Sequence, residues 1–199
     1  MSEPSPLRRV CVFCGSNPGR RPEYAEAARE MGRVLVDRGI GLVYGGGKVG
    51  LMGIVADTVL AGGGEVIGVI PEALMAREVG HPGLTEMHVV RTMHERKAMM
   101  ADRADAFVAM PGGFGTFEEY CEVLTWSQLG FHPKPCGLLN VAGYYDPLLA
   151  LFDRGVEEGF VPRHHRALVI EETDPARLLD RFAGFRPPST SKWISLDER

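Results

Sequence analysis

The sequence predicts an α/β fold, in which a mostly parallel β-sheet is covered by helices on both faces and so forms three layers. Short apolar runs of four to six residues alternate with longer amphipathic segments along the chain. Most of these runs end at glycine or proline, which is typical of the buried strands of a parallel sheet. With 199 residues and 45% hydrophobic content, the chain suits one compact domain with a sizeable core.

The strands are expected where the apolar runs lie, at residues 9–14, 41–44, 66–70, 87–90, 105–110, 136–141 and 167–170. Between the first two, a helix is expected to begin at Pro22 and to end at Gly39, because proline suits a helix start and glycine its exit. Its apolar face is formed at helical spacing by Tyr24, Ala28, Met31 and Leu35. The later helices are expected at residues 50–61, 92–104, 116–129, 144–158 and 174–182.

Two segments have no regular pattern, residues 71–85 and the tail 186–199. We therefore expect a single domain over residues 1–199 with its core at about 8–185. In a sheet of this kind, ligands bind beyond the carboxyl ends of the strands, where the strand order reverses. Because the segment 71–85 follows such a strand end, it is expected to line the site.

The composition argues against two classes of partner. The formal net charge is −4 and no basic run occurs, so no nucleic acid is expected to bind. No segment approaches the ~20 apolar residues that a membrane span needs, and the first six residues do not resemble an apolar leader. We expect a cytoplasmic protein that does not associate with membranes.

The four cysteines and six histidines do not form a metal site by their spacing. Cys11 and Cys14 have the C-x-x-C spacing, but three positions apart on a strand they point to opposite faces. Cys121 and Cys136 are distant in sequence, and the histidines form no i, i+4 pair. We expect buried thiols that act as small hydrophobic groups, and no protein-bound metal.

The most informative segment is the glycine-rich stretch that follows the fifth expected strand. Four of its residues can contact a phosphate through backbone N–H groups or a hydroxyl: Gly112, Gly113, Gly115 and Thr116. The first turn of the helix after it offers unpaired amides and about half a unit of positive charge. Two carboxylates, Glu118 and Glu119, are expected in that same turn.

Two more glycine-rich loops are expected at the same edge of the sheet, at residues 14–19 and 45–50. The second matches the dinucleotide fingerprint G-x-G-x-x-G, with Glu72 near the position of a ribose-binding acid. Against that interpretation, the fingerprint belongs after the first strand, and a dehydrogenase usually needs a substrate domain as well. Each loop alone is also typical of a tight turn, but together they favour a nucleotide-like anion.

The segment Met93–Met100 opens the helix that is expected after the fourth strand. For an arbitrary helix, this pattern predicts Met93 and Met100 in the core and Arg96 and Lys97 in solvent. This helix, however, begins at the edge that carries the glycine loops. A guanidinium in its first turns can therefore pair with a phosphate or with the Glu119 carboxylate.

Together these motifs resemble the LONELY GUY (LOG) family of cytokinin riboside 5'-monophosphate phosphoribohydrolases, long mislabelled as lysine decarboxylases. The resemblance covers about residues 8–185. It is carried by Cys14-Gly-Ser16, Val43-Tyr-Gly-Gly-Gly47 with Gly50-Leu-Met-Gly53, Val69-Ile-Pro71, Met93-His-x-Arg-Lys97, Pro111-Gly-Gly-x-Gly-Thr-x-x-Glu119, and Gly137-Leu-Leu-Asn140 with Gly143-Tyr-Tyr145. One departure is Lys48, which adds a charge where the family pattern has a small residue.

The resemblance implies a Rossmann-like homodimer that needs no cofactor. Its substrate would be a nucleoside 5'-monophosphate, either a cytokinin riboside 5'-monophosphate or AMP, whose N-glycosidic bond is hydrolysed to free base and ribose 5-phosphate. The resemblance also implies that Arg96 and Glu119 are catalytic. The residues that it implies for substrate binding are Ser16, Gly46, Gly47, Glu78, Lys97, Gly112, Gly113, Gly115, Thr116, Glu118 and Thr125.

The chemistry of these side chains is consistent with such roles. Cleavage of a glycosidic bond builds positive charge on the ribose, and a carboxylate beside the anomeric carbon stabilises that charge or activates water. Neighbours on a helix diverge by about 100°, so only one of Glu118 and Glu119 can face the sugar directly. Our hypothesis is that Glu119 does so, while Arg96 orients it and holds it ionised.

Other functional classes remain as alternatives. Molybdenum-cofactor carriers of the same fold hold a nucleotide-like ligand without hydrolysing it, but they have no need for a pair such as Arg96 and Glu119. An NAD-dependent dehydrogenase predicts a nicotinamide-dependent absorbance change, which a hydrolase does not give. Lysine decarboxylation needs a pyridoxal-binding lysine in a larger cofactor site, and neither Lys48 nor Lys97 has that context.

Overall fold

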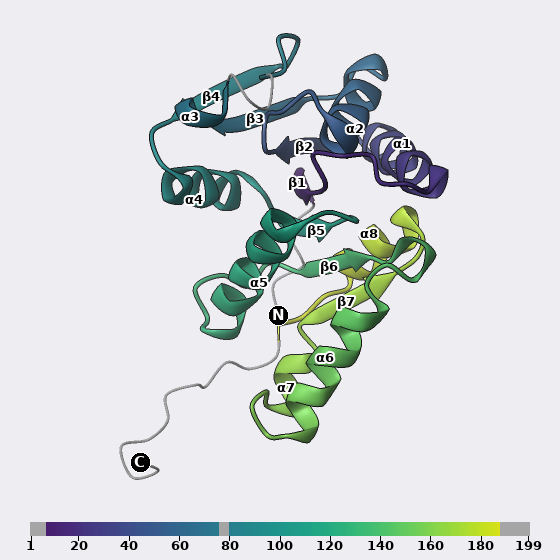
Figure 1. Cartoon of the computed structure of the whole chain (residues 1–199), viewed down its shortest axis with the longest axis vertical. Coiled ribbons are helices and arrows are strands. Elements are labelled where there is room, and N and C mark those ends of the chain that lie inside the picture. Colours follow the sequence, from purple (N-terminus) through teal and green to yellow (C-terminus); the bar gives the residue numbers. More distant parts are fainter. Residues whose placement is uncertain (1–6, 76–79, 188–199) are drawn as a thin grey trace.

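A computed structural model describes residues 7–75 and 80–187 of the chain (Figure 1). Within these residues, seven strands form one sheet in the order β4-β3-β2-β1-β5-β6-β7, and every neighbouring pair is parallel. The strands are β1 Arg9–Phe13, β2 Gly41–Tyr44, β3 Val66–Pro71, β4 Glu86–Val90, β5 Ala106–Ala109, β6 Cys136–Leu139 and β7 Val169–Glu172. The predicted α/β class with a parallel sheet is confirmed.

Helices cover both faces of this sheet, as expected, with α1 and α2 on one side and α4 and α5 on the other (Figure 1). The helices are α1 Pro22–Asp37, α2 Gly50–Ala61, α3 Glu72–Met75, α4 Met93–Arg103, α5 Phe114–Gln128, the 3-10 turn η1 Val141–Gly143, α6 Asp146–Glu157, α7 Arg163–Arg166 and α8 Pro175–Ala183. Helix α1 begins at Pro22 and is followed by Gly39 with a positive φ of 64°, as the sequence predicts.

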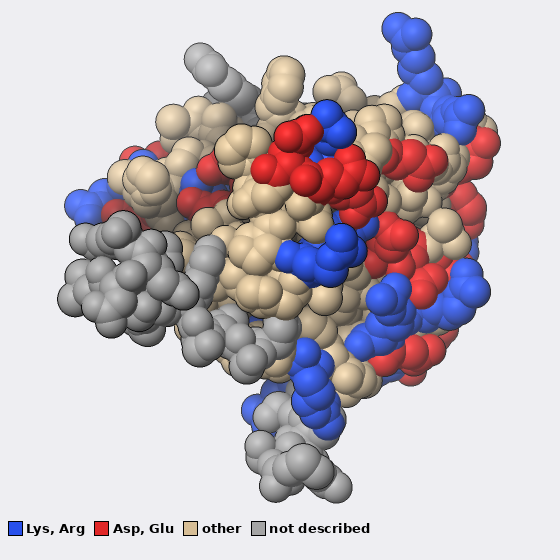
Figure 2. Space-filling model, turned by 90° about the horizontal axis from the view of Figure 1, so that it is seen from below, with Lys and Arg blue, Asp and Glu red and all other residues tan. Residues whose placement is uncertain are grey.

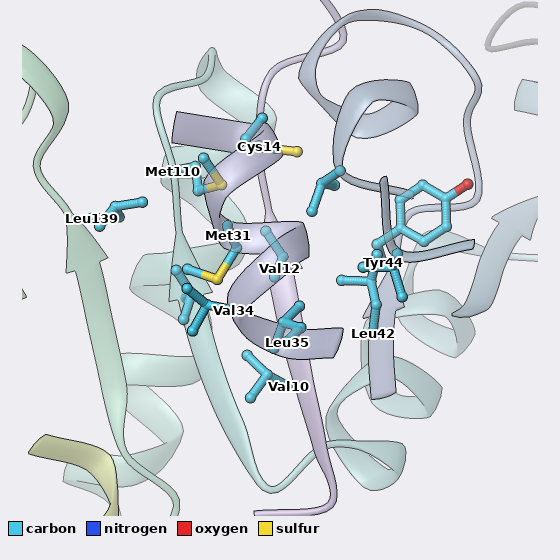
Figure 3. Close-up of a cluster of buried hydrophobic side chains, with 14 of the residues drawn as sticks. Val10, Val12, Cys14, Met31, Val34, Leu35, Leu42, Tyr44, Met110 and Leu139 are labelled. Carbon is cyan, nitrogen blue, oxygen red and sulfur yellow. The ribbon is translucent and has the colours of Figure 1, made fainter. Parts of the chain in front are cut away.

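The central strand β1 divides the core into two apolar clusters because its side chains alternate between the faces. Val10 and Val12 pack with Met31 and Leu35 of α1, as Figure 3 shows, while Cys11 belongs to the cluster on the opposite face. Cys14, after the strand, lies in the first cluster, so the two thiols of the C-x-x-C motif are separated as predicted. All four cysteines are free.

Several element boundaries differ from the predictions. Helix α5 begins at Phe114, two residues earlier than expected, because the extended backbone of Gly113 can precede the first helical turn. Glu118 and Glu119 therefore lie in the second turn of α5, not in the first. Strand β7 lies two residues later than expected, because it is an edge strand whose last residues, including the exposed Glu171, carry no apolar signal.

The segment 71–85, predicted to be irregular, contains the one-turn helix α3. The short helix α7 was not predicted at all, because four residues give too short a pattern to detect a period.

Charged side chains of both signs are intermixed on the face shown in Figure 2, which agrees with the small net charge of −4. In the described parts of the chain, no helix has both the length and the apolar character that crossing a membrane requires.

The reversal of strand order lies at β1, which has β2 on one side and β5 on the other. The loops that leave β1, β2 and β5 meet there, as predicted. The N–H of Gly15 donates to the carbonyl of Pro111 at 3.0 Å, and the N–H of Leu51 donates to the carbonyl of Gly15 at 2.9 Å. A Cβ at Gly50, whose φ is +59°, would lie 2.3 Å from the Ser16 carbonyl carbon, so only glycine permits this approach.

Candidate active site

A cleft of about 300 Å³ opens beyond the carboxyl ends of β1 and β5, at the reversal of the strand order. Its walls come from the loop after β1 and from the first turns of α2, α4 and α5, with one residue of α3. Among the residues predicted for the site, those that line this cleft are Ser16, Arg96, Gly113, Gly115, Thr116, Glu118 and Glu119. The structure thus brings together residues that are up to 103 positions apart, from Ser16 to Glu119.

The start of α5 places backbone N–H groups of the kind that suit an anion at the cleft. The N–H groups of Phe114, Gly115 and Thr116 lie in the first helical turn, where no intrahelical acceptor exists. A Cβ atom added at Gly113 or Gly115 would meet nothing within 4 Å, so a side chain there would extend into open space. These two glycines keep the amides accessible to a phosphate.

Gly112 has a different role, because it allows close packing. A Cβ at this position would lie 2.1 Å from Oγ1 of Thr116 and 2.9 Å from the nitrogen of Gly15. The glycine therefore lets the loop after β5 pack against the loop after β1.

Two ionisable side chains that are rarely buried lie in this cleft. Arg96 of α4 is 5% exposed and Glu119 of α5 is 9% exposed. The Nη2 of Arg96 donates to the carbonyl of Gly45 at 3.2 Å, and this bond ties the guanidinium to the loop after β2. Burial of a charge is costly unless it is paired, so such positions are candidates for functional groups.

Cys14 also lines the cleft but is unsuited to act as a nucleophile. Its burial, with the nearby negative charge of Glu119, raises the pKa of the Cys14 thiol well above its ordinary value. The reactive form of cysteine is the thiolate, which is therefore scarce at neutral pH. The other ionisable side chains that line the cleft are those of Arg96, Glu118 and Glu119.

Lys97 lies behind the cleft, where its Nζ bridges two carboxylates of α5. It is 2.6 Å from Oε1 of Glu118 and 2.9 Å from Oε1 of Glu122, and its side chain is 10% exposed. Burial lowers the pKa of Lys97, but the hydrogen bonds to the two glutamates outweigh it, so the net pKa is raised. Glu122 was missed by sequence reasoning, although its i, i+4 spacing from Glu118 places both on one helix face.

Besides Lys97, four predicted site residues in the described parts of the chain do not line this cleft. Gly46 and Gly47 are buried, and they pair with residues 81 and 80 through a 2.9 Å hydrogen bond and an isolated β-bridge. Thr125 donates to the carbonyl of Cys121 and lines a separate pocket of about 170 Å³ that α6 and α7 help to form. Gly112, as described, lies behind the loop. Glu78 lies outside the described residues.

The cleft also has an apolar wall that was not predicted from the sequence, formed by Met52, Leu74, Met93 and Phe114. Met93 was expected in the core but is 41% exposed, and Phe114 is 90% exposed. Both are the first residue of their helix. Such a wall suits contact with a flat base or an apolar substituent.

Among the side chains of residues 7–75 and 80–187, no group of three or more histidine, cysteine, aspartate or glutamate residues has a geometry that could bind one.

Comparison with known proteins identifies the family. A family model described as "Possible lysine decarboxylase" matches residues 52–182. The probable cytokinin riboside 5'-monophosphate phosphoribohydrolase LOGL1 of Oryza sativa subsp. japonica is 57% identical over 87% of this chain and 78% of that protein. The cytokinin riboside 5'-monophosphate phosphoribohydrolase LOG7 of Arabidopsis thaliana is 50% identical over 92% of this chain and 84% of that protein.

Solved structures share the fold at low identity. The molybdenum cofactor binding protein of Rippkaea orientalis has a TM-score of 0.67 at 18% identity, over 91% of this chain and 98% of that one. The molybdenum cofactor carrier protein of Chlamydomonas reinhardtii has a TM-score of 0.65 at 20% identity, over 89% and 99%. Identities this low establish the fold alone. The sequence matches are much stronger, and they show that the chain belongs to the LOG family, whose family model keeps the older description of a possible lysine decarboxylase.

Proposed function

We propose that this protein hydrolyses the N-glycosidic bond of cytokinin riboside 5'-monophosphates, or of AMP, and releases free base and ribose 5-phosphate. One observation carries the proposal: a buried arginine and a buried glutamate, Arg96 and Glu119, line the same cleft as the free amides at the start of α5. Relatives that are 50% and 57% identical and are named for this activity support it.

In this proposal, the substrate phosphate binds to the amides of the first turn of α5. The partial positive charge of about half a unit at a helix N-terminus favours the phosphate there, and Oγ1 of Thr116 adds a donor. Glu119 follows Thr116 by three residues, about 4.5 Å along the helix axis. A phosphate held at the first turn therefore directs the attached ribose toward the second turn, which carries Glu119.

The proposed chemistry uses Glu119 at the sugar. As the bond between the anomeric carbon and the base nitrogen breaks, its electron pair goes to the base and positive charge develops on the ribose. The Glu119 carboxylate stabilises that charge and orients a water molecule, whose oxygen bonds to the anomeric carbon while a proton is transferred to the base. The proposed role of Arg96 is to hold the Glu119 carboxylate ionised and oriented.

The experiment is incubation of the purified protein with AMP and with isopentenyl-adenosine monophosphate, with chromatographic separation of the products. Free base and ribose 5-phosphate are expected. Arg96→Ala and Glu119→Ala should abolish their release while circular dichroism shows a retained fold. Lys48→Ala is the matched control, because Lys48 is exposed and does not line the cleft.

Two outcomes contradict the proposal. The first is that the unmodified protein leaves every monophosphate intact. If it binds the nucleotides without cleaving them, a carrier function gains support instead. The second is normal turnover by the Arg96→Ala or Glu119→Ala variant.

We also infer that the protein acts as a homodimer in the cytoplasm. Apolar side chains at the rim of the cleft, Met93 at 41% and Phe114 at 90% exposure, are the kind of surface that a second subunit covers. Light scattering at the protein concentration of the assay tests the dimer, and a fully active monomer would contradict it. Microscopy of a fluorescent fusion tests the location.

A further inference from the structure

In the loop after β5, the backbone carbonyl groups of residues 110–112 each accept a hydrogen bond. The Met110 carbonyl accepts from the Tyr145 hydroxyl at 2.7 Å, and the Pro111 carbonyl accepts from the N–H of Gly15 at 3.0 Å. The Gly112 carbonyl accepts from the Tyr144 hydroxyl. Carbonyl oxygens repel a phosphate, so a loop that binds an anion must direct them away from it. Of the three, only the Gly112 carbonyl shares its peptide with a residue that lines the cleft, Gly113.

The two tyrosines are held by a fixed segment between β6 and α6. The side chain of Asn140 accepts from the N–H of Tyr145 and donates to Oδ1 of Asp146, both at 2.7 Å. Between them, Ala142 has a φ of +52°, a left-handed conformation that is unfavourable for a residue with a Cβ and persists only where its surroundings enforce it. The hydrogen bonds of Asn140 and the conformation of Ala142 therefore fix the backbone that carries Tyr144 and Tyr145.

The ring of Tyr144 is fixed by its neighbours. It stacks on Phe117 of α5, with ring centroids 6.3 Å apart and planes 25° apart, and it meets the ring of Tyr24 edge-on at 5.8 Å. Burial raises the pKa of the Tyr144 phenol, although its bond to Gly112 opposes that shift. At neutral pH the hydroxyl therefore keeps the proton that it donates.

We propose that Tyr144 is a positioning residue for phosphate binding, because it fixes the peptide that joins Gly112 to Gly113. In a trans peptide, the C=O and N–H groups point in opposite directions. With the Gly112 carbonyl held by Tyr144, the N–H of Gly113 points away from that tyrosine, toward the cleft that Gly113 lines. Tyr144 thereby adds a fixed amide donor to those of the first turn of α5. This inference rests on the proposed function of the same site.

Tyr145 provides a matched control within the same loop. Its hydroxyl holds the carbonyl of Met110, and the next residue is Pro111, which has no N–H group. Loss of that bond frees no amide donor. A structural effect of losing a hydrogen-bonded tyrosine hydroxyl is therefore common to Tyr144→Phe and Tyr145→Phe, whereas an effect on phosphate is expected only from Tyr144→Phe.

The experiment compares the two variants with the unmodified protein by calorimetric titration with ribose 5-phosphate. Tyr144→Phe is expected to raise the Kd about tenfold, the equivalent of one charge-assisted hydrogen bond. Tyr145→Phe is expected to change it less than twofold. For AMP hydrolysis, Tyr144→Phe should raise KM by a similar factor with little change in kcat. The inhibition constant of adenosine, which lacks a phosphate, should be unchanged.

An unchanged Kd in Tyr144→Phe overturns the inference, as does an equal weakening in Tyr145→Phe or failure of the unmodified protein to bind ribose 5-phosphate. If the unmodified protein binds ribose 5-phosphate but cleaves no monophosphate, the proposed function fails. The comparison of Kd values still decides the role of Tyr144 in that case.

Discussion

The carbonyl oxygen of Gly45 accepts a hydrogen bond from Nη2 of Arg96 at 3.2 Å, and a Cβ atom at position 45 would lie 2.1 Å from that same nitrogen. The buried guanidinium therefore occupies the space that a side chain at position 45 would need. A residue of the loop after β2 thus determines where a proposed catalytic group of α4 lies.

Replacement of this glycine tests the relationship. In Gly45→Ala, the end of the Arg96 side chain must move, because the new methyl group and Nη2 cannot both occupy this space. We expect kcat/KM for AMP to fall about 100-fold, as for other displacements of about 1 Å in a catalytic site, with a small change in Tm. Gly184→Ala is the control, since its Cβ would make only ordinary contacts of 3.8 Å or more. Equal activity of both variants would contradict this role of Gly45.

Replacement of Gly115 by alanine is expected to have opposite effects on stability and on activity. It lies in the first turn of α5, and a Cβ there would meet nothing within 4 Å. Gly115→Ala should therefore raise the free energy of unfolding by about 0.5 kcal/mol through helix propensity. Because the methyl group extends into the space proposed for the phosphate, KM for AMP should rise several-fold. Urea denaturation and steady-state kinetics measure the two effects.

Gly155→Ala in α6 serves as the control for activity, because Gly155 lies in a helix but does not line the cleft. An unchanged KM in Gly115→Ala would mean that the phosphate does not approach the start of α5.

The packing of α8 on the sheet depends on Gly137 of β6. A Cβ at this position would lie 2.6 Å from the ring of Phe182 and 2.8 Å from a methyl group of Leu178. Gly137→Ala should lower the free energy of unfolding by about 1–3 kcal/mol, the usual cost of overpacking. In the double variant with Phe182→Leu, the smaller side chain should recover part of this loss. Strictly additive free energies in denaturation experiments would show that the two sites are not coupled.

The ion pairs of Lys97 with Glu118 and Glu122 predict that the stability of the protein falls at alkaline pH. Its pKa is raised in the folded protein, so its contribution is fully present below the pKa of the unfolded chain, about 10.4, and is lost as pH rises through the folded value. Above about pH 10, the free energy of unfolding should fall more steeply in the unmodified protein than in Lys97→Met. Urea denaturation between pH 8 and 11 measures both slopes. Parallel curves would contradict the prediction.

The buried parts of the fold could be predicted from the sequence because their physical signal is local. Strand β1 is buried on both faces and leaves a continuous apolar run, and the face of α1 formed by Ala28, Met31 and Leu35 is fully buried as its spacing predicts. Strand β7 was displaced in the prediction because an edge strand need not be apolar throughout. The start of α5 was displaced because glycine gives no propensity signal for a helix start.

The cleft could be predicted only as a set of loop ends that meet at one sheet edge. That Arg96 is buried follows from the space left at Gly45, which is a contact between distant segments and has no local signal. The same holds for the bridge from Lys97 to Glu122 and for the bond from Tyr144 to Gly112. Motif spacing predicted seven of the residues that line the cleft, but not which partner each one has.

The central claim is that the phosphate binds at the first turn of α5 while Glu119 faces the anomeric carbon. The most direct test is a crystal structure of the Glu119→Gln variant with AMP, in which the substrate should remain intact. We expect phosphate oxygens within hydrogen-bond distance of the N–H groups of Phe114–Thr116, and the anomeric carbon about 3.5 Å from the side chain of residue 119. A phosphate bound elsewhere, or a ribose turned away from residue 119, would contradict the account.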